Sequence, residues 1–195
     1  MNNQKIFLIT GISSGFGRAF ASAALSAGNM VVGTVREQTA CGNFESERPG
    51  FAKAVVLDVT DFDAIESKVA EIEQTIGPVS VLVNSAGYGH EGTIEESPLA
   101  ELRHQFDVNV FGAVAMIKAV LPFMRERRTG HIINITSMGG YITLPGISYY
   151  CAVYLTQKEI RRVRKKGQSM NLALRFFKWV IACTRRARYR ARLLN

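Results

Sequence analysis

The sequence has few of the residues that build disulfide frameworks and metal centres. It has three cysteines, an odd number, and they lie far apart at Cys41, Cys151 and Cys183. No two of them have the spacing of metal ligands, which is typical of a chain in a reducing compartment and predicts a cytoplasmic protein. The histidines are equally scattered and form no H-x-x-x-H pattern, so we expect no metal site on them: His90, His104 and His131.

Long apolar runs are also absent from the sequence. The apolar run nearest the N-terminus, residues 6–9, is shorter than the apolar segment of a secretory signal. We find no stretch that reaches the ~20 consecutive apolar residues of a membrane-spanning helix. With an apolar fraction of 47%, the composition predicts a globular domain with a buried core, and we expect no membrane partner.

Acidic residues almost disappear from the last fifth of the chain. Residues 1–154 carry 11 lysines and arginines against 15 acids, whereas residues 155–195 carry 13 against one acid, Glu159. The net charge changes from −4 to +12 between these parts, and the whole chain carries +8. Proline is also absent after Pro145. We therefore divide the chain into a body, residues 1–154, and a basic tail, residues 155–195.

The body alternates short apolar runs with helical patterns, and glycine, proline or capping residues separate them. Strands are predicted at residues 6–9, 30–35, 54–57, 79–83 and 131–136. Helices are predicted at residues 15–27, from a capping-box-like start at 60–63 to 77, and from 97–98 to about 128, with at most a short helix within 37–52. This alternation predicts an α/β fold with a parallel sheet and helices on both faces.

The predicted long helix is apolar nearly all round. Phe106, Val110 and Val114 fall on one side of it, and Phe111 and Met116 fall on others. A helix of this kind is buried on more than one face. It either lies under another element of the same chain or packs against a second subunit.

A glycine-rich turn joins the first predicted strand to the first helix. Residues 10–17 read T-G-I-S-S-G-F-G. Glycine is needed where φ is positive or where the backbone approaches a ligand closely. The helix N-terminus that follows offers free N–H groups to a pyrophosphate, and Ser13 and Ser14 add hydroxyl donors. Because the turn directly follows a buried strand, the pattern favours a dinucleotide site over a plain tight turn.

Four further motifs follow the glycine turn in order. They are Asp58-Val59 after the third strand, N-S-A-G at 84–87 after the fourth, N-V-F-G at 109–112 in the long helix, and Ser137 with Tyr150 13 residues later. With the G-x-x-x-G-x-G turn they resemble the short-chain dehydrogenase/reductase family, in its NADP-preferring branch. The resemblance implies a doubly wound, Rossmann-like sheet. We expect that sheet to be incomplete at its C-terminal end, because the sequence after Tyr154 departs from the family.

The resemblance implies roles for individual residues and a small-molecule alcohol or carbonyl as substrate. Tyr150 would transfer the proton, Ser137 would hydrogen-bond the substrate oxygen, and Asn109 would support a water-borne proton relay. The family also forms homo-oligomers, which the altered sequence after Ala152 threatens. The implied cofactor-binding residues are Gly11, Ser13, Ser14, Gly15, Phe16, Gly17, Asp58, Val59, Asn84, Ala86 and Gly87.

The end of the second predicted strand indicates which cofactor is bound. In the family an acid at this place usually binds the ribose hydroxyls of NAD. Here the strand ends Thr34-Val35-Arg36, and Glu37 comes one residue too late. Arg36 is able to pair with a 2′-phosphate instead. We therefore expect NADP(H) rather than NAD(H), unless Arg36 is a solvated loop charge.

One member of the family's catalytic set is missing. The family reads Y-x-A-S-K, and its lysine lowers the pKa of the tyrosine and holds the nicotinamide ribose. This chain has Tyr154 in place of that lysine, and Lys158 lies two helical turns from Tyr150. General acid–base catalysis contributes ~10²–10⁴-fold, so we expect an NADP(H)-dependent oxidoreductase with impaired activity. The alternatives are an inactive nucleotide-binding pseudoenzyme and a nucleic-acid or membrane protein that binds through the tail.

Three hypotheses account for the basic tail. The first is out-of-frame sequence that begins near codon 152; it predicts a Ser-Lys and a later Pro-Gly in another reading frame. The second is a real basic extension that binds nucleic acid or anionic lipid, through residues 161–166 and 185–192. The third is a divergent protein that binds nucleotide without catalysis. We favour the first, expect no specific nucleic-acid partner, and note that residues 172–183 have the pattern of a helix.

Overall fold

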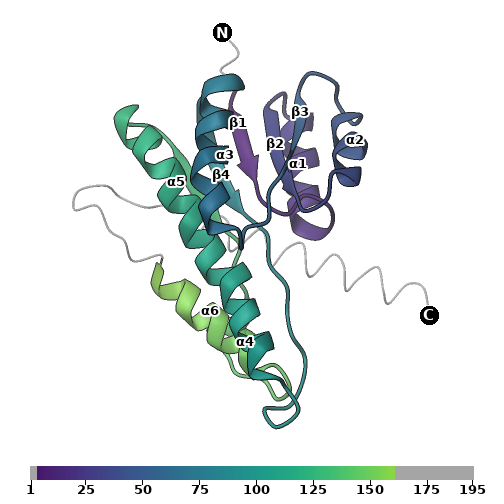
Figure 1. Cartoon of the computed structure of the whole chain (residues 1–195), viewed down its shortest axis with the longest axis vertical. Coiled ribbons are helices and arrows are strands. Elements are labelled where there is room, and N and C mark those ends of the chain that lie inside the picture. Colours follow the sequence, from purple (N-terminus) through teal and green to yellow (C-terminus); the bar gives the residue numbers. More distant parts are fainter. Residues whose placement is uncertain (1–3, 161–195) are drawn as a thin grey trace. The chain divides into compact units, whose positions relative to one another are not determined.

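Five parallel strands form one sheet in the part of the chain that the computed structural model describes, residues 4–160. The strands are β1 (Ile6–Ile9), β2 (Met30–Val35), β3 (Ala52–Val56), β4 (Val79–Asn84) and β5 (His131–Asn134). Their order is β3-β2-β1-β4-β5 (Figure 1), so the strand order reverses beside β1. This confirms the predicted doubly wound sheet. In such sheets ligands bind at the carboxyl ends of the strands, where the order reverses.

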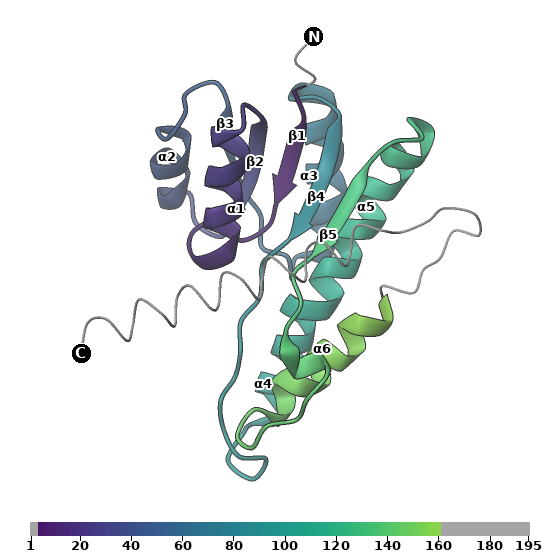
Figure 2. The same ribbon diagram turned by 180° about the vertical axis from the view of Figure 1, so that it is seen from behind.

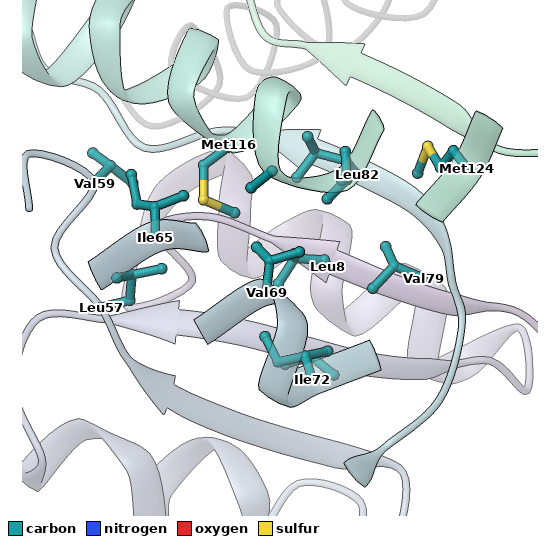
Figure 3. Packing of buried hydrophobic residues seen from close by; sticks show 13 residues of the cluster. Leu8, Leu57, Val59, Ile65, Val69, Ile72, Val79, Leu82, Met116 and Met124 are labelled. Atoms are coloured by element: carbon teal, nitrogen blue, oxygen red, sulfur yellow. The ribbon is translucent and has the colours of Figure 1, made fainter. Parts of the chain in front are cut away.

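Helices cover both faces of the sheet (Figures 1 and 2). Helices α1 (Gly15–Ser26) and α2 (Thr39–Glu45) lie on one face, and α3 (Phe62–Thr75) and α5 (Ala113–Glu126) lie on the other. Because side chains alternate along a strand, Leu8 joins the cluster under α3 and α5, whereas Ile9 joins the cluster under α1 and α2. Figure 3 shows the first cluster, in which Leu8 meets Val69 of α3 and Met116 of α5. Full burial of each large apolar side chain stabilises the fold by about 2 kcal/mol.

Most element boundaries agree with the sequence predictions, with four differences. Strand β3 begins and ends earlier than predicted, and β5 ends at Asn134, before the predicted residue 136. Helix α3 is capped by Asp61, whose carboxylate accepts a hydrogen bond from the Ala64 N–H at 3.2 Å. Thr60, the predicted cap, instead donates its hydroxyl to Asp58 at 2.8 Å. The sequence places the start of a further helix at Tyr150, and this helix, α6 (Ser148–Ile160), begins two residues earlier in the structure.

A partly buried ion pair ties α3 to the end of α5 and to β4. The Arg127 guanidinium donates to both oxygens of Glu73, at 2.6 and 3.0 Å, and to the Val79 carbonyl at 3.0 Å. Glu73 is largely buried, and it also accepts a hydrogen bond from the Val79 N–H at 3.1 Å. The pair is bidentate and fully hydrogen-bonded, which is the arrangement in which a buried charge is compensated.

The predicted long helix is continuous from Leu99 to Glu126 and spans 28 residues. It consists of α4 (Leu99–Phe106), a π-helical segment η1 (Asp107–Gly112) and α5. By length and composition this helix could cross a membrane, although the sequence has no run of ~20 consecutive apolar residues. Helices of a globular core pass the same test, and α5 packs against β4 and α3 here. The π-helical segment carries Asn109 and therefore lies at the candidate site, where such segments are frequent.

The last described helix, α6, packs against α4, η1 and the short 3-10 turn η2 (Met138–Gly140) (Figure 2). It thereby brings Tyr150 to the end of the sheet at which β5 finishes. The basic tail from residue 161 onward and the helix predicted at 172–183 lie outside the described residues, as does the side chain of Lys158.

Candidate functional site

The glycine turn leaves β1 and enters α1 in the conformation that its sequence requires. Gly11 and Gly15 have positive φ values of 71° and 58°, which only glycine adopts readily. A Cβ at Gly17 would lie 2.1 Å from the Gly11 carbonyl oxygen, so α1 and the turn touch at this point. The side chain of Ser14, the N-cap residue of α1, makes no capping hydrogen bond. The first N–H groups of this helix and the exposed Ser13 and Ser14 are therefore available to an anion.

Thr10 joins the glycine turn to the loop that follows β4. The Thr10 side chain is buried, and its oxygen accepts hydrogen bonds from Ser85 N–H at 3.0 Å and Ala86 N–H at 2.9 Å. A Cβ at Gly11 would lie 2.9 Å from the Ala86 Cα, so the two loops are in direct contact. The Asn84 amide donates to Asn134 of β5 at 2.8 Å and extends the connection. The sheet thus brings together the predicted residues of the first and fourth strand ends.

Arg36 and Asp58 follow neighbouring strands at the same edge of the sheet. Val35 pairs with Val56 in the sheet, and the Leu57 N–H continues the pairing by donating to the Val35 carbonyl at 2.9 Å. Arg36 is exposed at this place. Asp58 accepts two hydrogen bonds from Thr60, from the N–H at 2.9 Å and the hydroxyl at 2.8 Å. These bonds fix the Asp58 carboxylate just beyond the carboxyl end of β3.

Asn109 makes hydrogen bonds to two other segments of the chain. Its side-chain oxygen accepts from the Tyr88 N–H at 3.1 Å, and its amide donates to the Tyr88 carbonyl at 2.7 Å. Its own carbonyl accepts a hydrogen bond from the Gln157 amide of α6. Asn109 therefore links the loop after β4, the π-helical segment and α6. The relay role implied by the resemblance stays a prediction, because these contacts show a structural role.

Ser137 and Tyr150 meet at the backbone of Gly139. The Ser137 oxygen accepts a hydrogen bond from the Gly139 N–H at 3.2 Å. A Cβ at Gly139 would lie 3.0 Å from the Tyr150 ring, so this ring rests directly on the glycine. Because the Ser137 hydroxyl accepts from the backbone, its proton is left for another acceptor, such as a substrate oxygen. The predicted pair is therefore assembled by the turn η2.

Tyr154 occupies the position one helical turn after Tyr150. The two ring centroids lie 4.5 Å apart, with the ring planes inclined at 56°. Burial above all, and then charge repulsion from and hydrogen bonding to Tyr150, raise the pKa of Tyr154 above its ordinary value. Tyr154 is therefore neutral at physiological pH. The side chain of α6 that packs against the Tyr150 ring is thus an uncharged phenol.

Several residues of the site were not found from the sequence. Thr34 accepts a hydrogen bond from the Gly11 N–H at 3.3 Å, and its one signal is that it is polar within an apolar strand. Gly139 follows the predicted Ser137 by two residues, and a glycine there was a usable signal of close packing. Gln157 and Asn134 gave no signal, since their partners lie 48 and 50 residues away in the sequence.

Comparisons with known proteins agree with this geometry. The family model described as short chain dehydrogenase matches residues 5–153. The 3-ketodihydrosphingosine reductase of Bacteroides thetaiotaomicron is 40% identical over 148 residues, which are 76% of this chain and 52% of that protein. The NADPH-dependent 3-dehydrocapnine reductase of Ornithobacterium rhinotracheale is 36% identical over 149 residues, 73% of this chain and 53% of that protein.

A solved structure shows the same similarity in three dimensions. The crystal structure of a short-chain dehydrogenase from Streptomyces avermitilis matches with a TM-score of 0.78 at 42% identity, over 81% of this chain and 58% of that one. The chain therefore spans about half the length of the curated relatives it matches. The family match ends at residue 153, one residue before Tyr154.

Proposed function

Because the chain belongs to the short-chain dehydrogenase family, we propose that it transfers a hydride between NADP(H) and a small-molecule alcohol or carbonyl. The observation that carries this proposal is the meeting of Ser137 and Tyr150 at Gly139. Both lie past the carboxyl end of β5, at the same edge of the sheet as the glycine turn after β1. A dinucleotide held by that turn would extend along this edge toward them.

The residues present fit a phosphorylated dinucleotide. The glycine turn and the open N-terminus of α1 would hold the pyrophosphate, and the Arg36 guanidinium would pair with a 2′-phosphate. No acid stands at the end of β2 to favour an unphosphorylated ribose. The relative from Ornithobacterium rhinotracheale carries NADPH-dependent in its name, which supports the same choice. When bound, the nicotinamide supplies the hydride.

The chain's own residues would move the proton and hold the substrate oxygen. Ser137 would donate its hydroxyl proton as a hydrogen bond to the carbonyl oxygen, and Tyr150 would deliver a proton to the alkoxide that forms. Neutral Tyr154 supplies no positive charge to favour the tyrosinate in the reverse direction. We therefore infer slow turnover. The second candidate, a nucleotide-binding protein without turnover, is favoured by the same Tyr154.

The substrate class follows from the surface that borders Ser137. Met138 of η2 is exposed, and so are Tyr141, Ile142 and Leu144 in the segment between η2 and α6. An apolar carbonyl compound matches such a border better than a charged one. The named substrates of the two relatives, 3-ketodihydrosphingosine and 3-dehydrocapnine, are consistent with a ketone as the group reduced. A cytoplasmic location fits a cofactor of this kind.

The long helix supplies a surface for a second copy of the chain. A groove of ≈ 460 Å³ lies along α4 and η1, where Leu99 and Phe111 are 59% and 51% exposed. The groove is apolar except for Arg103 and Asp107, one helical turn apart. In a two-fold pair, Arg103 of each copy would reach Asp107 of the other, which makes the surface self-complementary. We propose a homodimer through this helix.

Cofactor binding by the full chain tests the proposed function. NADPH fluorescence should saturate on titration, and Gly17→Ala should abolish this signal, because its Cβ would collide with the Gly11 carbonyl. Gly42→Ala, in α2 with open space around it, is the matched control and should bind normally. If neither NADPH nor NADH binds the folded chain, the proposal is wrong.

A further inference from the structure

Two glycine backbones border opposite edges of the Tyr150 ring. A Cβ at Gly139 would lie 3.0 Å from Cδ1 and 3.1 Å from Cε1, and a Cβ at Gly89 would lie 3.0 Å from Cδ2 and 3.1 Å from Cε2. Contacts this close require a neighbour to shift, so the ring fits between these residues because both are glycine. Tyr154 packs against the same ring from α6. We call this arrangement of Gly89, Tyr150 and Gly139 the tyrosine slot.

The Gly139 N–H donates a hydrogen bond to the Ser137 hydroxyl oxygen. Gly89 belongs to the loop after β4, whose position depends on other contacts. That loop is tied to the segment before α6 by the Gly92 N–H, which donates to the Gly146 carbonyl at 2.8 Å. A parallel bridge between Gly92 and Ile147 continues this pairing. These two backbone contacts therefore hold the loop after β4 against the start of α6, and their loss would let the two segments move independently.

Tyr149 and His90 add side-chain contacts to the same junction. The Tyr149 hydroxyl donates to the Ser97 carbonyl at 2.9 Å, and the Tyr149 ring is buried. His90 stacks on that ring with centroids 5.7 Å apart, and its Nε2 lies 2.9 Å from the Ser97 hydroxyl oxygen. The His90 Nδ1 faces Glu101 at 3.8 Å. His90, the neighbour of Gly89, thus contacts the segment that carries Tyr150. Tyr149, the neighbour of Tyr150, contacts the loop segment that carries Gly89.

We propose that Tyr149 and His90 are positioning residues for the proton-transferring phenol. Tyr149 precedes Tyr150, and His90 follows Gly89, so their contact holds the glycine edge of the loop against the ring. The Tyr149–Ser97 hydrogen bond sets how far α6 stands from that loop. Loss of this bond lets the loop move away, and the ring then leaves the slot. This inference rests on the proposed function for its catalytic meaning, although the slot itself is a matter of geometry.

Nitration of tyrosine by tetranitromethane reports on the slot directly. The reagent attacks the Cε carbons, and each Cε of Tyr150 faces one of the two glycines. The rate at Tyr150, divided by the rate at the exposed Tyr141 of the same molecule, is measured by peptide mass spectrometry on the full chain. Tyr149→Phe removes only the hydroxyl and should raise this ratio about fivefold, as expected for the loss of one hydrogen bond.

Two matched variants separate positioning from general loosening. Thr156→Ala removes a side-chain hydrogen bond of α6, from Thr156 to the Ala152 carbonyl at 3.0 Å, that does not reach the loop; it should leave the ratio unchanged. Gly89→Ala fills one edge of the slot and should raise the ratio. Equal ratios for Tyr149→Phe and Thr156→Ala would overturn the proposal. If Tyr149→Phe does not fold, His90→Phe replaces it. This variant keeps the ring stack on Tyr149 but loses the contact with Ser97, and its nitration ratio is compared with that of Thr156→Ala in the same way.

NADPH titration of the same variants keeps this inference apart from the proposed function. The glycine turn lies between β1 and α1, so Tyr149→Phe should bind NADPH like the wild-type chain. A chain that binds no dinucleotide but shows the raised nitration ratio contradicts the proposed function and supports the slot. If the chain binds NADPH but Tyr149→Phe leaves the nitration ratio unchanged, the proposed function is supported and the positioning role is contradicted.

Discussion

The ring of Tyr154 lies 4.5 Å from the ring of Tyr150, centroid to centroid, with the two planes inclined at 56°. The neighbour of Tyr150, the proposed proton donor, is therefore a second phenol, which burial keeps protonated. A cation in this place would favour ionisation of Tyr150, whereas a neutral phenol does not.

Tyr154→Lys should raise the rate of NADPH-dependent carbonyl reduction. A lysine one helical turn from Tyr150 supplies the missing positive charge, and the gain should reach about 10²-fold, the lower end of a general acid–base contribution. The measurement is the loss of NADPH absorbance with a panel of apolar ketones. Tyr154→Phe is the control, because it changes the side chain without adding charge and should give no gain. Equal rates in both variants would contradict the role given to the charge.

The raised pKa of Tyr154 makes the folded chain sensitive to alkali. Burial raises this pKa above the unfolded value of ~10. The stabilising contribution of neutral Tyr154 is therefore complete below pH ~10 and is lost as pH rises toward the folded pKa. Denaturant unfolding at increasing pH should show a steeper loss of stability in the wild type than in Tyr154→Phe. Parallel curves would mean that Tyr154 is not buried as described.

Arg36→Ala should weaken NADPH binding far more than NADH binding. The guanidinium at the end of β2 would pair with the 2′-phosphate, which only NADPH carries, so we expect at least a tenfold loss, about 1.4 kcal/mol, for that cofactor alone. Fluorescence titration with both cofactors gives the two affinities. Lys53→Ala, which removes an exposed positive charge from β3, is the control for long-range electrostatics. Equal losses for NADPH and NADH in Arg36→Ala would exclude the 2′-phosphate contact.

Phe111→Asp should dissociate the proposed dimer. The substitution places a carboxylate in the apolar groove of α4 and η1, where pairing would bury it, and should weaken self-association by at least about tenfold. Analytical ultracentrifugation over a concentration series measures this change. Phe62→Asp, at an aromatic that is 44% exposed on α3, introduces the same charge elsewhere and should not alter the mass. A wild-type chain that is monomeric at all concentrations would contradict the interface.

Arg127→Ala should strongly destabilise the fold without touching the candidate site. It leaves the largely buried Glu73 carboxylate without its bidentate partner, and the free energy of unfolding should fall by about 3 kcal/mol. Lys68→Ala removes the exposed Lys68–Glu71 pair on the same helix and should lower it by less than about 0.5 kcal/mol. Chemical denaturation of both variants provides the comparison, and similar losses would mean that the Glu73 pair is solvated.

The sequence predicted those parts of the site that lie in one continuous motif. The glycine turn is such a part, because Gly11, Gly15 and Gly17 shape the backbone through contacts within seven residues. The strand-helix alternation is local in the same sense, whereas the doubly wound sheet was expected from the resemblance to the family. Element ends were less well predicted where polar residues compete, as at Thr60, which bonds Asp58 and leaves the cap to Asp61.

Contacts between distant segments could not be predicted. Thr10 binds Ala86, 76 residues away, and Gln157 binds Asn109, 48 residues away. Nothing in the local pattern of either residue indicates its partner, because the partner is chosen by the packing of the sheet and of α6. For the same reason the contacts of the Asn109 side chain with the Tyr88 backbone could not be predicted, and the relay role of Asn109 stays a prediction.

By itself the sequence determined the family, the sheet, the pair Ser137 and Tyr150, and the absence of a lysine at position 154, since each of these is a local pattern or a residue identity. Only the tertiary structure decided what surrounds Tyr150. It placed Gly89 and Gly139 at the edges of the ring and the phenol of Tyr154 against it. Tyr154 is a local neighbour, one helical turn away on α6, but Gly89 and Gly139 belong to other segments, and their contact with the ring exists only after the loops and α6 have packed together.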